Sequence, residues 1–113
     1  LSLTSAARSS EEIRESVIAA RALQIERFSE LEGVYSNAMM SPSLVRETCT
    51  INNAGRTLLK TAMDKLGLSA RAFDRILKVS RTIADLAGKE AIMVEHLAEA
   101  IQYRSLDRES WGM

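Results

Sequence analysis

The 113-residue chain has 15 Lys and Arg against 15 Asp and Glu, and 46% of its residues are hydrophobic. This length and composition fit one domain, and the zero net charge excludes a general attraction to nucleic acids or membranes, so any basic site must be a local patch. No apolar run approaches the roughly 18 residues of a membrane helix, and the first residues do not resemble a secretory leader. The expected compartment is the cytoplasm, with the only cysteine, Cys49, buried among apolar residues.

Helix is the only regular structure that the sequence predicts, because helix-favouring residues dominate while Gly and Pro are few. After a flexible lead-in over residues 1–8, a first helix is expected to begin at Ser9 or Ser10 and to end near Gly33. Apolar residues at helical spacing predict its buried stripe: Ile13, Val17, Ala20, Ile25, Phe28 and Leu31.

Gln24 interrupts this stripe, three residues from both Arg21 and Arg27. A buried amide without a partner costs about 1–3 kcal/mol. The sequence therefore predicts a structural role for Gln24, hydrogen-bonded to a neighbouring helix or to a backbone carbonyl.

The middle of the chain predicts a loop over residues 33–41 and a short helix from Pro42 to about Cys49. A third helix is expected to begin between residues 50 and 53 and to end at Gly67, a residue suited to a left-handed cap. Gly55 lies inside this helix, where glycine costs about 1 kcal/mol relative to alanine. Close packing against a neighbouring backbone is the expected reason for it.

The fourth helix has the clearest pattern, with Ser69 as its N-cap and Gly88 at its end. Its apolar stripe is Phe73, Ile76, Leu77, Ser80, Ile83, Ala84 and Ala87. A last helix is expected from about Val94 to Tyr103, and residues 109–113 are expected to form a polar tail. Residues 9–108 are thus predicted to form an all-α domain, an irregular bundle of about four to five helices.

Catalytic and metal-binding groups are scarce. The only histidine, His96, is expected to be a partly exposed helix residue, since no second member of a catalytic constellation accompanies it. His96 with Glu95 and Glu99 offers too few converging ligands for a metal. The sequence also has no G-x-x-x-x-G-K-[ST] and no G-x-G-x-x-G loop for phosphate. The chain by itself is therefore predicted to be no enzyme and to bind no metal or cofactor.

A basic row on the fourth helix is the candidate site. Arg71, Arg75 and Lys78 lie opposite the apolar stripe, and a solvated surface would explain them equally well. Arg71, however, is in the first helical turn, where the helix dipole is already positive and a cation gains nothing. A phosphate outside this chain would account for its position.

Two long segments resemble a known family. Residues Gly67–Leu86 (GLSARAFDRILKVSRTIADL) and His96–Arg104 (HLAEAIQYR) are similar to the C-terminal region of magnesium-chelatase-like AAA+ ATPases of the competence protein ComM group. Upstream, the similarity is carried by Ile13–Val17, Ala20, Arg21, Gln24, Arg27, Phe28, Asn37 and Ala38. The resemblance covers residues 9 to 108.

The resemblance implies that the chain is the helical lid beside an ATP-binding core. Its Ser-x-Arg motif resembles sensor 2 and assigns the sensor arginine to Arg71, where a guanidinium could pair with the γ-phosphate in the same or a neighbouring subunit. The implied partners are the AAA+ core of the same polypeptide, the other subunits of a hexamer and, through the parent protein, DNA. ATP and Mg would be bound by the parent. The Walker A, Walker B and arginine-finger motifs belong to that core, and chelatase activity does not carry over.

Two other interpretations stay open on the residues alone. The chain could be a free-standing helical module that binds nucleic acid or protein through the Arg71, Arg75 and Lys78 face. It could also be a bundle with only a scaffolding role.

Overall fold

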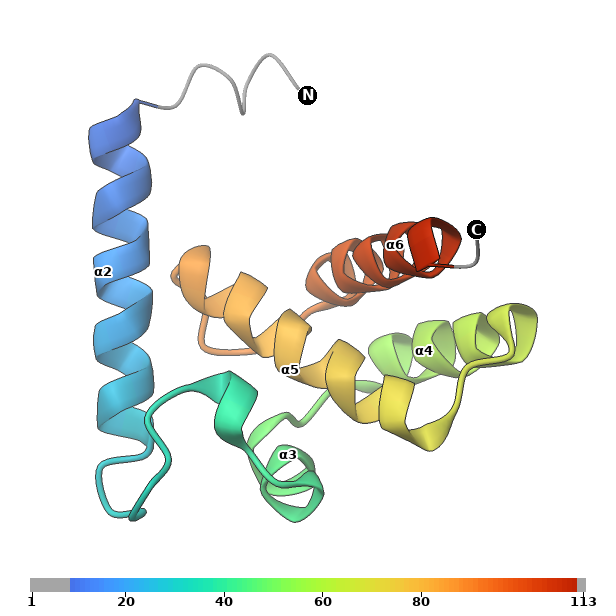
Figure 1. The fold of residues 1–113 in the computed structure, drawn as a ribbon, viewed down its shortest axis with the longest axis horizontal. Helices are drawn as coiled ribbons and strands as arrows, with labels where there is room; N and C mark the ends of the chain where they lie inside the picture. Colours follow the sequence, from blue (N-terminus) through green and yellow to red (C-terminus); the bar gives the residue numbers. More distant parts are fainter. Residues whose placement is uncertain (1–8, 112–113) are drawn as a thin grey trace.

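The computed structural model describes residues 9–111, with side chains described as far as residue 103. Its helices are α2 (Ser10–Arg27), the 3-10 turn η1 (Asn37–Met39), α3 (Pro42–Thr48), α4 (Asn53–Leu66), α5 (Ala70–Leu86) and α6 (Val94–Trp111), shown in Figure 1. No strand occurs within the described range, apart from one isolated parallel bridge between Ile51 and Ile92. The predicted all-α bundle is confirmed.

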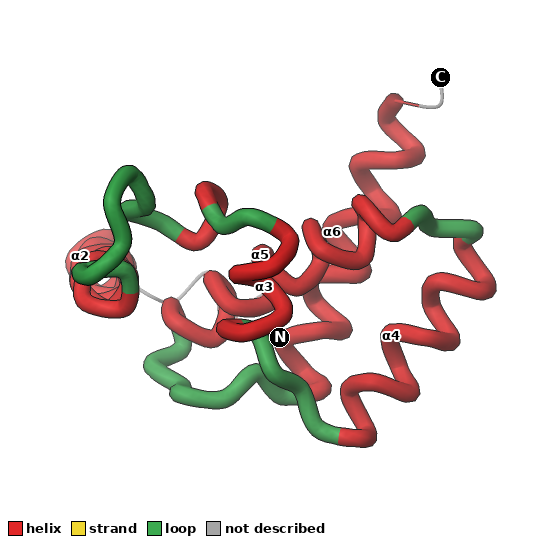
Figure 2. Tube along the Cα trace, turned by 90° about the horizontal axis from the view of Figure 1, so that it is seen from below, coloured by secondary structure: helices red, strands yellow, loops and turns green. Residues whose placement is uncertain are grey.

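Helix α5 is the centre of the bundle. It contacts α2, η1, α3 and α6, and α4 packs against α6 (Figures 1 and 2). Helix α2 stands at one edge of the molecule, where Figure 2 shows it end-on. The bridge between Ile51 and Ile92 ties the segment before α4 to the segment before α6.

Local capping explains where most helices begin. Ser9, Asn52 and Ser69 accept hydrogen bonds from the backbone N–H groups three residues later, at 3.0, 2.8 and 3.3 Å. At Ser9 the bond is reciprocated by Glu12, which completes a capping box. Helix α4 ends at Gly67, whose φ of 62° is the left-handed conformation predicted for it.

The prediction for the first helix is wrong in two respects. Helix α2 ends at Arg27, and residues 28–33 form turns instead of further helix. Most of its expected core positions are exposed, because only the C-terminal half of α2 lies against α5: Ile13 is 47%, Val17 40%, Ile25 56% and Leu31 42% exposed. Of the expected stripe, only Ala20 and Phe28 are buried.

The last helix is longer than predicted. Helix α6 continues to Trp111, so residues 109–111 of the expected tail are helical. Residues 104–111 contain no Gly or Pro, so nothing in the sequence stops the helix near Tyr103.

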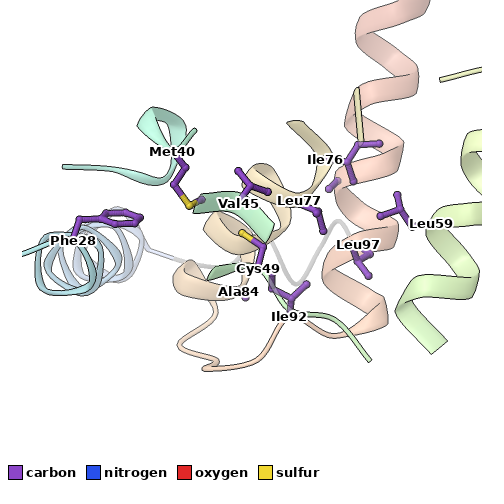
Figure 3. Packing of buried hydrophobic residues seen from close by; sticks show 11 residues of the cluster. Phe28, Met40, Val45, Cys49, Leu59, Ile76, Leu77, Ala84, Ile92 and Leu97 are labelled. Carbon is purple, nitrogen blue, oxygen red and sulfur yellow. The ribbon is translucent and has the colours of Figure 1, made fainter. Parts of the chain in front are cut away.

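The core joins residues of α3, α4, α5 and α6 with the residues that directly follow α2 and η1. Figure 3 shows Phe28, at the C-cap of α2, pointing toward Met40 and Val45, while Leu59 of α4 and Leu97 of α6 face each other beside Ile76. Cys49 is 4% exposed, as predicted.

Gly55 lies where α4 approaches α6. A Cβ at this position would stand 2.7 Å from Cδ1 of Leu97, so the close neighbour is a side chain and not the expected backbone. Because Leu97 is fully buried, it has little room to move.

We expect Gly55→Ala to lower the free energy of unfolding by about 1 kcal/mol. Overpacking typically costs about 1–3 kcal/mol, against about 1 kcal/mol gained in helix propensity. Urea unfolding would measure the change. In the control background Leu97→Val, which removes the opposing atom, the same substitution should be neutral or stabilising. A Gly55→Ala variant more stable than the parent would contradict this packing.

Candidate functional site

The three basic residues predicted from the sequence line one surface pocket. This pocket, of about 750 Å³, lies between α5 and the segment around η1, and its lining residues are Ala38, Pro42, Arg71, Asp74, Arg75, Lys78, Val79 and Thr82. Arg71 and Arg75 are exposed, and Lys78 is half-buried. The volume lies within the roughly 300–1,000 Å³ typical of small-molecule sites.

The three cations differ in what holds them. Lys78 donates a hydrogen bond of 3.3 Å to the carbonyl oxygen of Ala38, which ties it to η1. Arg71, two residues after the N-cap Ser69, has no hydrogen bond or ion pair with the part of the chain that the structure describes. Arg71 is therefore a guanidinium available to an external anion, at the positive end of α5.

An acidic residue lies in the same pocket. The side chain of Asp74 is 14% exposed, its Oδ1 is buried without a partner, and its Oδ2 is 3.9 Å from a guanidinium nitrogen of Arg46. The carboxylate offsets part of the positive charge of Arg71, Arg75 and Lys78. The pocket is therefore less positive than its three cations alone would make it.

Behind the pocket lies a buried polar network that joins α2, η1 and α5. Arg27 makes a bidentate pair with Asp85, at 2.9 and 2.7 Å, and Asn37 donates to Asp85 at 2.9 Å. Asn37 also donates to Oγ1 of Thr82, which lines the pocket. The network is thus continuous with the pocket wall.

Gln24 and Arg81 make the remaining bonds of this network. Oε1 of Gln24 accepts the backbone N–H of Asn37, the first residue of the neighbouring 3-10 turn η1, at 3.0 Å. Arg81 pairs with Asp85 at 3.2 Å and donates to the carbonyl oxygens of Lys89 and Glu90. The side chain of Asp85 is 0% exposed, so its charge depends on these partners.

Electrostatics follow from this geometry. Burial would raise the pKa of Asp85, but hydrogen bonds from Arg27 and Asn37 and the charges of Arg27 and Arg81 hold that pKa below its ordinary value. The hydrogen bond to Asp85 raises the pKa of Arg27. Burial raises the pKa of the Cys49 thiol to about 11, which leaves it protonated and unreactive at neutral pH.

His96 is buried, at 4% exposure, where the sequence predicted partial exposure. The ring Nδ1 of His96 accepts a hydrogen bond from the backbone N–H of Met93 at 2.9 Å. The backbone N–H of His96 in turn donates to the carbonyl oxygen of Met93. The bond to Nδ1 has the role of the Glu or Gln in a capping box, at the third position of α6. The burial follows from that bond, which holds the ring against the start of the helix.

We expect His96→Ala to lower the free energy of unfolding by at least about 1 kcal/mol, because a cap and a packed side chain are both lost. His96→Gln should lose less, since its side-chain oxygen can accept the same N–H. Chemical denaturation compares the two variants. Equal losses would show that the bond to Met93 contributes nothing.

Sequence reasoning missed the network around Asp85. Arg81 and Asp85 fall within the apolar stripe of α5, four residues apart, and a charge pair inside an apolar stripe is the signal that could have indicated burial. Arg27 entered as a sequence neighbour of Gln24, and both Arg27 and Asn37 entered as points of family resemblance. Among the residues with described side chains, no group of three or more His, Cys, Asp or Glu could hold a metal ion. No helix in the same part of the chain has the length and apolarity to cross a membrane.

Comparisons with known proteins agree on one family. The family described as "Magnesium chelatase, subunit ChlI C-terminal" matches residues 7–104. Competence protein ComM of Haemophilus influenzae is 43% identical over 99 residues, which are 88% of this chain and 18% of that protein. The uncharacterized protein YifB of Escherichia coli is 38% identical over 100 residues, 88% of this chain and 19% of its own length. An uncharacterized protein of Mycobacterium tuberculosis is 33% identical over 96 residues, 85% of this chain and 19% of its own length.

The chain spans about a fifth of the length of these relatives. No solved structure matches it significantly. The family match includes the whole of α2 to α5, and with them the pocket and the buried network. The chain therefore belongs to the family of C-terminal domains of the magnesium chelatase subunit ChlI.

Proposed function

We propose that this chain is the helical lid of a AAA+ ATPase and that Arg71 is its sensor 2 arginine. One observation carries the proposal: Arg71 is exposed at the first turn of α5, without a partner in the described part of the chain, at the mouth of a basic pocket. A guanidinium held there can pair with two phosphate oxygens and neutralise charge during phosphoryl transfer.

The fit to a nucleotide is limited to its phosphates. Arg71 and Arg75 offer exposed guanidinium groups, whereas the 113 residues contain no phosphate-binding loop. ATP and Mg would therefore be held by a core elsewhere in the parent protein, in which the lid contributes to ATP hydrolysis and to subunit assembly in a hexamer. We further propose that the parent acts on DNA, in recombination in the cytoplasm, which is consistent with the competence name of the Haemophilus influenzae relative.

The test uses the full-length protein. Arg71→Ala should lower ATPase turnover at least about tenfold without changing the unfolding midpoint, because arginines that stabilise phosphoryl transfer contribute roughly 10³–10⁵ in kcat. Turnover equal to that of the parent would refute the sensor assignment.

A second candidate is direct binding of nucleic acid, favoured by the presence of all three cations in one pocket. Binding would weaken with salt, with a slope of about 0.7–0.9 per phosphate contacted. Arg71→Glu with Arg75→Glu should abolish this binding in the full-length protein. If the double variant binds DNA with the affinity and salt slope of the parent, this face is not the DNA site.

A further inference from the structure

The N-terminal half of α2 exposes apolar side chains that the bundle does not cover. Ile13 is 47%, Val17 40% and Ile18 60% exposed, whereas Ala20 farther along the helix and Phe28 at its C-cap are buried against the bundle. Figure 1 shows this half of α2 standing clear of the other helices. Apolar residues gathered on one exposed surface indicate a contact with another body.

The same surface is also basic. With 3.6 residues per turn, Arg14 and Arg21 project between Val17 and Ile18. Glu11 lies at the edge of this surface beside Ile18, whereas Glu12, Glu15 and Glu26 project on the opposite side. We call the surface formed by Ile13, Arg14, Val17, Ile18 and Arg21 the α2 face. A complementary surface would be apolar with acidic side chains.

A second copy of the chain does not satisfy this pattern. Two α2 faces packed antiparallel around Val17 would place Arg14 of one copy against Arg21 of the other, which is repulsive. Parallel packing along the whole helix would compete with the bundle, which already buries Ala20 and Gln24 in the C-terminal half of α2. The charges and the fold therefore favour a different polypeptide surface.

We propose that the α2 face is covered, in the full-length protein, by the domain that precedes this chain in the same polypeptide. The proposal rests on the proposed function, in which the chain is the lid of a longer ATPase. The family is described as a C-terminal region, and the chain spans 18–19% of the length of its relatives. The bulk of such a protein therefore precedes α2 in the sequence, and α2 is the helix of this chain nearest to it along the polypeptide. The contact fixes the direction in which the lid leaves the core.

Thiol labelling in the full-length protein tests this contact. Val17→Cys should react at least about tenfold more slowly than Glu15→Cys, which lies on the acidic side of the same helix, because labelling of a covered site requires local opening. Both positions are exposed in the lid itself, and native cysteines are subtracted with the unsubstituted protein. Ile18→Cys provides a second covered position.

The outcomes separate the possible occupants. Slow labelling of Val17→Cys that persists on dilution to a monomer supports the preceding domain. Protection that disappears on dilution assigns the face to a neighbouring subunit, and protection that needs anionic lipid vesicles assigns it to a membrane; either result overturns the proposal. Equal rates at Val17→Cys and Glu15→Cys also overturn it, even if Arg71→Ala still lowers ATPase turnover. Slow labelling with unchanged turnover in Arg71→Ala would refute only the sensor assignment.

Discussion

Replacing Asp85 with alanine is expected to lower the free energy of unfolding by about 3–5 kcal/mol, because removing one partner of a buried ion pair leaves an uncompensated charge. Two arginines would lose their partner. The side chain of Arg81 is 6% exposed and that of Arg27 is 21% exposed, so Arg81 is the costlier of the two to leave unpaired. Urea unfolding measures the loss.

Two comparisons sharpen this experiment. Asp64→Ala, at an exposed position of α4, should change stability by no more than about 0.5 kcal/mol. Asp85→Asn should fall between Asp85→Ala and the parent, since its amide keeps one acceptor for Arg27. A loss in Asp85→Ala no greater than in Asp64→Ala would show that the network does not stabilise the fold.

The same carboxylate gives the protein an acid-sensitive component of stability. Because the folded-state pKa of Asp85 lies below its ordinary value of 3.8, the ionised form stabilises the fold above that value, and this contribution is lost as pH falls through the folded-state pKa. Between about pH 5 and pH 2, the melting temperature of the parent should therefore fall more steeply than that of Asp85→Asn. Parallel slopes would contradict this sign.

Replacing Phe28 with alanine should cost about 3–5 kcal/mol, the range found for large aromatic residues in cores. Phe28, the C-cap of α2, is 2% exposed, and the buried residues of the helix itself, Ala20 and Gln24, include no large apolar side chain. Its loss would remove most of the apolar contact that holds α2 on the bundle.

Two control variants separate the effect of the lost side-chain volume at Phe28 from the effect of its buried position. Phe28→Leu keeps most of the apolar volume and should lose less than half as much as Phe28→Ala. Ile18→Ala removes an equally apolar side chain from the exposed part of α2 and should stay within about 0.5 kcal/mol of the parent in the chain alone. A loss from Phe28→Ala no larger than from Ile18→Ala would mean that α2 is not anchored through this ring.

The features predicted correctly from the sequence are local. Ser69 and Gly67 act on backbone groups within a few residues, so the start of α5 and the end of α4 follow from short-range rules. The exposure of Ile13 could not be predicted in this way, because helical periodicity shows which side of a helix is apolar but not how far the bundle extends along it.

In the candidate site, the basic residues of the pocket could be predicted from the sequence, whereas the buried network around Asp85 could not. Spacing along one helix placed Arg71, Arg75 and Lys78 on a common surface, and the structure brings all three to one pocket. The bonds of Asp85 to Arg27 and Asn37 span 58 and 48 residues of sequence, respectively. Their formation depends on the packing of α2 and η1 against α5, which no local pattern reveals.

The bridge between Ile51 and Ile92 has a consequence for the order of folding. The chain between its two ends contains all of α4 and α5, so the bridge closes a long loop, and the entropy cost of that closure disfavours early formation. Ile92 is 2% exposed, and its burial is completed in the same step. Docking of α6 should therefore come late in folding, and a φ-value near zero at Ile92 is its kinetic signature.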